Sequence, residues 1–116
     1  MGVKRIVANL QTSDPEKASA FYQDVLGLDL VMDHGWLRTY AGDGEARAQV
    51  GIASEGGSGA PVPLLSIEVD DVDAYYARAK AAQCEIVYDI VDEPWGVRRF
   101  FLRDPFGNIV NILMHH

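Results

Sequence analysis

The side chains best suited to chemistry are few in this sequence and lie apart from one another. The histidines are His34, His115 and His116, and Cys84 is the single cysteine. One cysteine forms no intrachain disulfide and no thiolate metal cluster within the chain. The sequence contains neither a G-x-S-x-G nucleophile turn nor a glycine-rich phosphate loop. We therefore expect Cys84 to be a small packing residue, and the terminal histidine pair to be a solvated tail.

Aromatic and arginine side chains recur at matching places in the two halves of the sequence. Trp36 follows Gly35, and Trp95 precedes Gly96, each at the entrance to an expected strand. Flat rings there would stack on a planar or sugar-bearing ligand, or they would plug the ends of the sheet. The positions that follow hold two further pairs, Arg38 with Arg99 and Tyr40 with Phe101. Arginines that point inward would bind an anionic group, and arginines that point outward would be solvated charges or dimer contacts.

Two segments alternate between an apolar and a mixed face, as half-buried strands do. Ile6, Ala8 and Leu10 share one face of residues 5–12, and Leu65, Ile67 and Val69 share one face of residues 64–69. We expect these apolar sets to pack on helices and the alternate residues to line a cavity or a subunit contact. With the later strands included, the inward set is Val7, Asn9, Gln11, Gln49, Leu64, Ser66, Glu68 and Asn111. Such a mixture is typical of a small-molecule pocket, although amides there also bond to backbone or line a wet dimer seam.

An amphipathic helix is predicted after each of these strands. The first spans residues 15–26, with Asp14 as its cap, Pro15 at its first position and Gly27 after its end. Its apolar stripe is Ala18, Phe21, Tyr22, Val25 and Leu26. The second spans residues 72–83, after the caps Asp70 and Asp71. Its stripe is Val72, Tyr75, Tyr76, Ala79 and Ala82.

Three short strands are expected after each helix, so the chain repeats one βαβββ unit. They are expected at residues 29–32, 36–41 and 46–53, and again at 85–89, 97–103 and 109–114. The predicted fold class is α+β, with two tandem βαβββ units forming a cupped, partly open mixed β-sheet and helices on its outer face. We expect one domain over residues 1–116, with unit one at about 4–54, a linker at 55–62 and unit two at about 63–114. The Gly- and Ser-rich linker is predicted to be flexible, either a plain connector or a mobile loop over the cup.

The composition is that of one globular domain. Of 116 residues 48% are apolar, and no segment approaches the length of a membrane span. Seventeen acidic and ten basic residues give a net charge of −7, which argues against nucleic acid and anionic membranes as partners. The first residues lack the apolar run of a signal peptide, so a cytoplasmic location is the default expectation.

Three motifs in combination resemble one known superfamily. They are residues 21–27 (FYQDVLG) after Asp14, residues 68–74 (EVDDVDA), and residues 94–108, which end in Asp104-Pro105-Phe106-Gly107-Asn108. Together they resemble the vicinal oxygen chelate superfamily, which includes glyoxalase I, extradiol dioxygenases, fosfomycin-resistance enzymes and bleomycin-resistance proteins. The resemblance covers nearly the whole chain. The motifs themselves are structural, since the Asp-Pro-x-Gly run suits a tight turn.

The resemblance also implies where a metal would bind in this chain. Metal-using members hold a divalent ion with His, Glu or Gln from the first and last strand of each unit. The corresponding positions here are Val7, Gln49, Leu64 and Asn111. Two aliphatic side chains and two neutral amides do not replace the imidazole or carboxylate ligands that such an ion requires. We expect no metal and no other cofactor.

The function that follows is a metal-independent binding protein of bleomycin-resistance type. We expect it to sequester an aromatic or glycosylated ligand in the sheet cup or a dimer cleft, with antibiotic resistance as one role, and to form a homodimer. The expected ligand-binding residues are Val7, Asn9, Trp36, Arg38, Tyr40, Gln49, Leu64, Ser66, Glu68, Trp95, Arg99, Phe101 and Asn111. No catalytic residue is assigned. The alternatives are a metal-dependent lyase or dioxygenase with an atypical site, and a protein whose exposed sheet only pairs with another chain.

Overall fold

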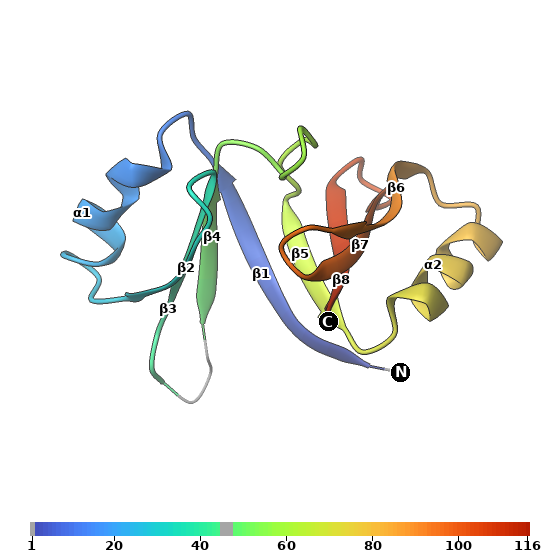
Figure 1. Cartoon of the computed structure of the whole chain (residues 1–116), viewed down its shortest axis with the longest axis horizontal. Coiled ribbons are helices and arrows are strands. Elements are labelled where there is room, and N and C mark those ends of the chain that lie inside the picture. The colour runs from blue at the N-terminus through green and yellow to red at the C-terminus, as the bar shows by residue number, and fades with distance from the viewer. Residues whose placement is uncertain (1, 45–47) are drawn as a thin grey trace. The chain divides into compact units, whose positions relative to one another are not determined.

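The computed structural model describes residues 2–44 and 48–116. These residues form two compact units. The N-terminal unit is Val7–Val62, and the C-terminal unit combines residues 2–6 with residues 63–116. Each has four sheet strands and one helical segment (Figure 1). The predicted α+β class and the βαβββ plan are confirmed, and β1 (Val3–Gln11) is divided between the two units.

The N-terminal unit carries its strands in the order β2-β3-β4-β1. Strands β1 and β4 are parallel, and the other neighbours are antiparallel. After β1 its elements are the 3-10 helix η1 (Pro15–Ala18), α1 (Ser19–Tyr22), β2 (Asp29–Asp33), β3 (Leu37–Ala41) and β4 (Gln49–Ala53). The strand expected at 46–53 begins in residues that the structure does not describe.

The C-terminal unit has the same plan, with the strand order β5-β8-β7-β6. Strands β5 and β8 are parallel, and the others are antiparallel. Its elements are β5 (Leu65–Val69), α2 (Val72–Ala81), β6 (Ile86–Glu93), β7 (Val97–Arg103) and β8 (Ile109–His115). The start of the chain joins this unit, because the Gly2 N–H donates to Asp70 Oδ1 and the Asp70 N–H donates to the Gly2 carbonyl.

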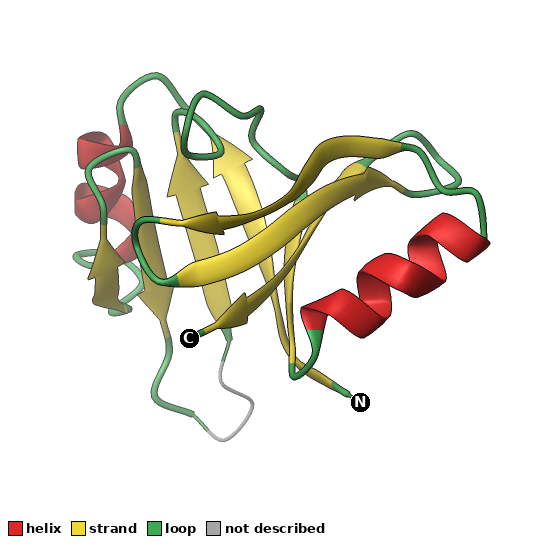
Figure 2. Cartoon of the chain, turned by 45° about the vertical axis from the view of Figure 1, so that its right-hand side comes forward, coloured by secondary structure: helices red, strands yellow, loops and turns green. Residues whose placement is uncertain are grey.

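Helix α2 packs against strands β7 and β8 of its sheet, as its sequence pattern predicts (Figure 2). Val72 and Ala79 are buried against Val69 and Phe100, and Tyr76 meets Phe100 edge to face at 5.1 Å between ring centres. The carboxylate of Asp71 caps the helix by accepting a hydrogen bond from the Ala74 N–H. The predicted helix is too long at its end, since Ala82 lies beyond the last turn and is exposed.

The first helical segment is shorter than predicted. Within it, only Ala18 and Tyr22 of the predicted stripe pack on Tyr40 and Ile52, while Phe21, Val25 and Leu26 are 51%, 68% and 52% exposed. The N–H groups of Gln23 and Asp24 both donate to the Ser19 carbonyl, so the last turn widens. A widened turn breaks the 3.6-residue period of the helix. The apolar residues that follow therefore no longer lie on the face that packs against the sheet.

The predicted cap of this segment is also wrong. The carboxylate of Asp14 makes no capping hydrogen bond, although Pro15 does sit in the first turn. The Asp14 N–H instead donates to the Thr12 hydroxyl at 3.2 Å. The hydroxyl therefore organises the entry to the helix, which the pattern of residue types did not indicate.

The segment predicted as a linker, residues 55–62, belongs to the N-terminal unit and folds into a compact loop. The Gly56 N–H donates to the Ala60 carbonyl at 2.7 Å, and the Ala60 N–H donates to the Gly57 carbonyl at 2.9 Å. Gly56 and Ala60 are buried, and a β-carbon at position 56 would lie 2.1 Å from the Pro61 carbonyl oxygen. Close backbone approach, not flexibility, is what requires glycine there.

None of the helices in the described residues is long and apolar enough to span a membrane.

The turn between β7 and β8 is built around one carboxylate, as its motif predicts. Asp104 Oδ1 accepts hydrogen bonds from the backbone N–H groups of Phe106 and Asn108, and Oδ2 accepts one from Asn108 Nδ2. Gly107 has φ +85°, which suits glycine. The side-chain bond from Asn108, followed by the backbone bonds, lowers the pKa of Asp104 below its ordinary value.

This turn gives a testable pH dependence. The pKa is lower in the folded chain than in the unfolded chain, so the stabilisation is complete above the unfolded value and is lost as pH falls through the folded value. We expect Asn108→Ala to raise the pKa of Asp104 toward its ordinary value, as followed by NMR titration of the carboxyl carbon. Phe106→Ala is the control, because it keeps the backbone donor. An Asp104 pKa that does not respond to the loss of the Asn108 side chain would contradict this account.

Candidate functional site

The sheet of the C-terminal unit has one face covered by α2 and one face that α2 does not cover. Leu65, Ile67 and Phe100 point toward α2, so the residues that alternate with them point away. We call this second surface the distal face. It is defined by Ser66 and Glu68 on β5, Arg99 and Phe101 on β7, and Asn111 on β8.

The structure thus brings together the predicted site residues of this unit. Phe101 pairs with Asn111, and Asn111 pairs with Ser66, so the three form one row across β7, β8 and β5. Leu64 immediately precedes β5 and is 47% exposed, and Trp95 lies in the turn between β6 and β7.

Asn111 is the most constrained amide of the distal face. The residue is only 7% exposed, and its Nδ2 donates a hydrogen bond to the Ser66 hydroxyl at 3.1 Å. Its Oδ1 is buried and has no hydrogen-bond partner within the described part of the chain. A buried carbonyl oxygen without a donor costs free energy.

Arg99 is held by a carboxylate and three aromatic rings. Nε and Nη2 both bond Glu93 Oε2, at 2.8 and 2.5 Å, and Tyr88 donates its hydroxyl to the same oxygen at 3.0 Å. Arg99 and Glu93 are 3% and 7% exposed. The guanidinium carbon lies 4.8–5.1 Å from the ring centres of Phe101, Trp95 and Tyr88. This cluster locks the β6–β7 hairpin and neutralises the arginine.

Sequence reasoning missed Glu93 and Tyr88. Both lie on β6, and the signal was available in the hairpin: Glu93 pairs with Val97 across the turn, which brings Arg99 diagonally within reach. The short Pro-Trp-Gly turn between the strands is what brings these residues together.

Glu68 is likewise engaged. Its Oε1 lies 2.7 Å from Arg5 Nε in an ion pair, and its Oε2 shares a 3.0 Å hydrogen bond with His115 Nδ1. Burial alone would raise the pKa of Glu68, but the bond to His115 and the charge of Arg5 together lower it. His115 therefore ends β8 and has a specific hydrogen-bond partner. The prediction of a solvated tail is wrong for this residue.

In the N-terminal unit the predicted residues divide between two faces. Val7 and Asn9 lie on the side of β1 opposite α1, because Ala8 pairs with Val50, which packs beneath the helix. Asn9 lies over Gly51 of β4, where an added β-carbon would come within 2.2 Å of Asn9 Oδ1. Gln49 begins β4 and is half-buried.

Arg38 and Tyr40 lie on the helix side instead. Tyr40 is fully buried against Tyr22, with ring centres 5.7 Å apart, and Arg38 Nη1 donates to the Ser19 hydroxyl at 3.1 Å. Trp36 stacks on His34 at 5.6 Å. The side chains of Arg38 and Tyr40 therefore support the first helix and do not share a face with Val7 and Asn9.

The predicted equivalence of Arg38 with Arg99, and of Tyr40 with Phe101, is wrong by one residue. Asp33 pairs with Arg38 across four residues, whereas Asp92 pairs with Arg98 across five. The extra residue in the second hairpin shifts a count made from Gly35 and Gly96 by one, so Arg38 corresponds to Arg98. Tyr40 corresponds to Phe100, since both are buried beneath the helix of their unit.

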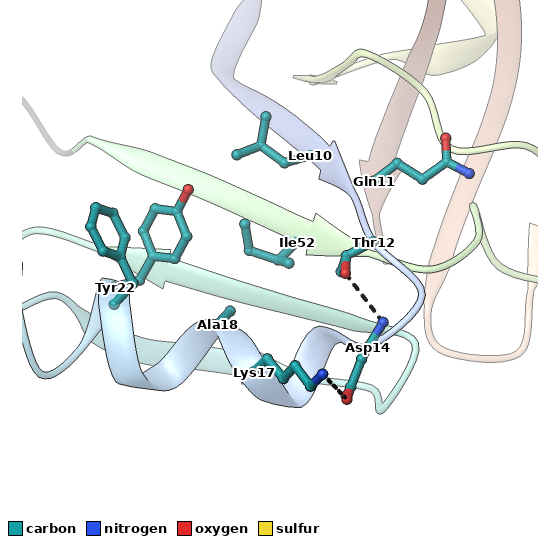
Figure 3. Close-up of a pocket in the computed structure, with 9 residues that line it drawn as sticks. Leu10, Gln11, Thr12, Asp14, Lys17, Ala18, Tyr22 and Ile52 are labelled. Carbon is teal, nitrogen blue, oxygen red and sulfur yellow. Dashed lines mark hydrogen bonds and ion pairs between the residues drawn. The ribbon is translucent and has the colours of Figure 1, made fainter.

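A shallow, open groove of about 330 Å³ lies in the N-terminal unit between α1 and the end of β1 (Figure 3). Its apolar walls include Leu10, Phe21 and Ile52, and Lys17 and Asp14 stand at its rim 4.0 Å apart. Sequence reasoning did not predict this groove, because it assigned Leu10 and Phe21 to a packed core.

The side chains at the positions that the family uses for a metal do not fit a divalent ion. Val7 and Leu64 offer no lone pair, and Gln49 and Asn111 offer only neutral amides. Among the described residues, no group of three or more His, Cys, Asp or Glu side chains is placed to hold a metal ion.

Comparison with known proteins assigns the family. A family model described as the Glyoxalase/Bleomycin resistance protein/Dioxygenase superfamily matches residues 3–112. The chain belongs to this superfamily. The resemblance seen in the three motifs is thereby confirmed for the glyoxalase/bleomycin-resistance superfamily.

Individual members of the glyoxalase/bleomycin-resistance superfamily differ in what they are called. A Mycobacterium bovis protein named "Putative glyoxylase CFP32" is 33% identical over 112 residues, which are 90% of this chain and 41% of that protein. The chain thus spans about two fifths of that relative's length. Among solved structures, a superfamily member from Vibrio splendidus has a TM-score of 0.67 at 20% identity, covering 97% of this chain and 99% of its own. An NAD-dependent benzaldehyde dehydrogenase structure from Legionella pneumophila has a TM-score of 0.76 at 15% identity, covering 97% and 100%. These two likenesses show the fold alone.

The Arg99–Glu93 pair can be tested against its neighbour in sequence. Removing one partner of a buried pair leaves an uncompensated charge, so we expect Arg99→Ala to lower the free energy of unfolding by about 3–5 kcal/mol in urea denaturation. Arg98→Ala is the matched control, because Arg98 bonds Asp73 and Asp92 at the surface. Its expected loss is about 0–1 kcal/mol. Equal losses for the two variants would mean that the buried cluster has no special weight.

Proposed function

We propose that this chain is a cytoplasmic, metal-independent protein that binds a small aromatic or glycosylated molecule. The observation that carries the proposal is the state of the charges on the distal face. Arg99 is bonded to Glu93, and Glu68 is bonded to Arg5 and His115. Carboxylates committed to cations serve poorly as general bases or metal ligands, whereas the amides and rings between them suit binding.

The roles of the predicted residues follow from their places. Ser66, Asn111, Trp95 and Leu64 would contact the ligand, while Arg99, Phe101 and Glu68 would hold the wall in position. In the N-terminal unit, Val7, Asn9, Gln49 and Trp36 remain proposed contact residues, and Arg38 and Tyr40 are withdrawn to a supporting role.

A metal-dependent enzyme is the second candidate, because one relative carries the name "Putative glyoxylase CFP32". In that case the reaction would be that of a lyase or dioxygenase of the superfamily. Elemental analysis of the purified protein separates the two candidates: a stoichiometric divalent ion would favour the enzyme.

Ligand-dependent stabilisation tests the binding proposal. Bleomycin and simple aromatic glycosides, added with EDTA present, are expected to raise the melting temperature. A ligand at 100 times its dissociation constant adds about 2.7 kcal/mol to the free energy of unfolding. Trp95→Ala is expected to remove the shift, and Phe106→Ala, at a side chain 86% exposed in the β7–β8 turn, is expected to keep it. The proposal fails if every shift is absent, or if the shifts require a metal.

The proposal includes a homodimer. The groove residues Leu10 and Phe21 are 46% and 51% exposed, and Val25 and Leu26 extend this apolar surface beyond α1. Apolar surface of this kind is stabilised when a second copy covers it.

Sedimentation velocity tests the dimer. At about 10 μM the chain is expected to sediment as a dimer, and Phe21→Glu is expected to shift it to monomer by placing a charge in the contact. Phe106→Glu is the control, since it adds the same charge to a residue that is already 86% exposed. A wild-type monomer, or equal effects of the two variants, would count against this surface as the interface.

A further inference from the structure

We infer that the groove beside α1 binds a cationic amphiphile, a molecule with an apolar ring and one protonated amine on a short linker. The ring covers Leu10, Phe21 and Ile52, and the amine bonds the carboxylate of Asp14 at the rim of the groove (Figure 3). The groove belongs to the N-terminal unit, so the inference does not depend on the ligand proposed for the distal face.

The groove is accessible to a ligand, because its apolar walls are exposed. Leu10 and Phe21 are 46% and 51% exposed, and the buried residues Ala18 and Ile52 complete the lining between them. Its volume of about 330 Å³ lies at the lower end of the range for small-molecule sites. An apolar body of that size would release water from these walls, which favours binding.

The charged groups of the lining lie together at one end of the groove. Asp14 and Lys17 stand beside Thr12, where the chain leaves β1, whereas Tyr22 lies at the far end of the helical segment (Figure 3). A ligand that follows the groove therefore meets charged side chains at one end and mainly apolar ones along the rest. One ionic group attached to one apolar body matches this arrangement.

The carboxylate of Asp14 is available to a ligand amine. It makes no capping hydrogen bond, and its ion pair with Lys17 has a long N–O separation of 4.0 Å. The side chain of Lys17 is 85% exposed, whereas that of Asp14 is 44% exposed. A long ion pair to a solvated lysine contributes little, so a ligand amine can replace Lys17 at the carboxylate.

The surrounding charge also favours a cation. Residues 7–62 hold eight Asp and Glu side chains and three Lys and Arg side chains. Glu16, in the first turn after Asp14, places a second carboxylate near the charged end of the groove. This negative field attracts an amine and repels a carboxylate.

Three probes that share a ring and differ in charge test the inference. Dissociation constants for phenethylamine, 2-phenylethanol and 3-phenylpropionate are measured by NMR titration of the 15N-labelled chain. We expect the amine to bind about fivefold more tightly than the alcohol, which corresponds to an ion pair of about 1 kcal/mol. High salt is expected to bring this ratio toward one, because the carboxylate is partly exposed. The backbone signals of Thr12, Ala18 and Ile52 are expected to move.

Two variants assign the preference for the amine to one carboxylate. Asp14→Asn removes the charge, keeps the size of the side chain and sacrifices no helix cap. It is expected to reduce the ratio to about one while the alcohol keeps its dissociation constant. Asp24→Asn is the matched control, since it removes the same charge from an exposed residue outside the groove lining, and the ratio is expected to persist.

The second copy proposed for this surface is the competing occupant. Leu10 and Phe21 would serve both contacts, so the amine and the second copy exclude each other. In sedimentation velocity, phenethylamine is therefore expected to shift the dimer toward monomer, and Asp14→Asn is expected to weaken this effect. This consequence rests on the proposed homodimer, whereas binding of the amine does not.

The outcomes separate the groove site from the dimer. Tightest binding of 3-phenylpropionate, equal binding of the amine and the alcohol at low salt, or equal loss of the ratio in both variants overturns the inference. So does a dimer that millimolar phenethylamine leaves intact with the groove signals unmoved. A chain that is monomeric before any amine is added, but binds the amine with the expected ratio, supports the groove site and overturns the dimer alone.

Discussion

The buried ion pair between Arg99 and Glu93 is the constraint on which the distal face depends. Two charges only a few per cent exposed are costly unless their bonds are nearly complete. Here one carboxylate oxygen receives both guanidinium nitrogens and the Tyr88 hydroxyl, and three rings surround the guanidinium. These hydrogen bonds and ring contacts hold the β6–β7 hairpin in one conformation and set the positions of Trp95 and Phe101. The ion pair also removes the positive charge that would otherwise dominate the chemistry of the surface.

The two units show how a single residue in a hairpin changes which side chains correspond. Both follow the same βαβββ plan, and both carry an arginine and an aromatic ring two residues apart on the helix side of the third strand of the plan. One additional residue in the β6–β7 hairpin makes Arg98 and Phe100 the counterparts of Arg38 and Tyr40, whereas Arg99 and Phe101 point away from the helix. The repeat was visible in the sequence because element lengths are similar. The direction in which individual side chains point could not be predicted. The spacing of a residue from a glycine does not show how many residues the hairpin contains.

The parts of the fold that could be predicted are those in which local and tertiary preferences agree. Helix α2 has its cap at Asp71, a regular apolar stripe and a sheet to pack against, and the Asp104 turn has a residue suited to each position. The first helix lacked that agreement. Its stripe of Phe21, Val25 and Leu26 suited a longer helix, but the backbone widens after Ser19 and only Ala18 and Tyr22 remain packed. Periodicity predicts which residues could be buried together and carries no information on how long the backbone keeps its period.

The same reasoning explains why the candidate site was found only in part. Alternation along β5 and β8 correctly placed Ser66, Glu68 and Asn111 on one face, because side-chain direction in a strand is set by the backbone. Which of them is free to bind depends on pairing, which alternation does not contain. Glu68 has the charge that usually marks a functional residue, yet it is bonded to Arg5 and His115, and within the described residues the neutral Asn111 holds a buried oxygen that lacks a partner. The charge of a side chain therefore does not by itself show whether its hydrogen-bonding groups are already satisfied within the fold.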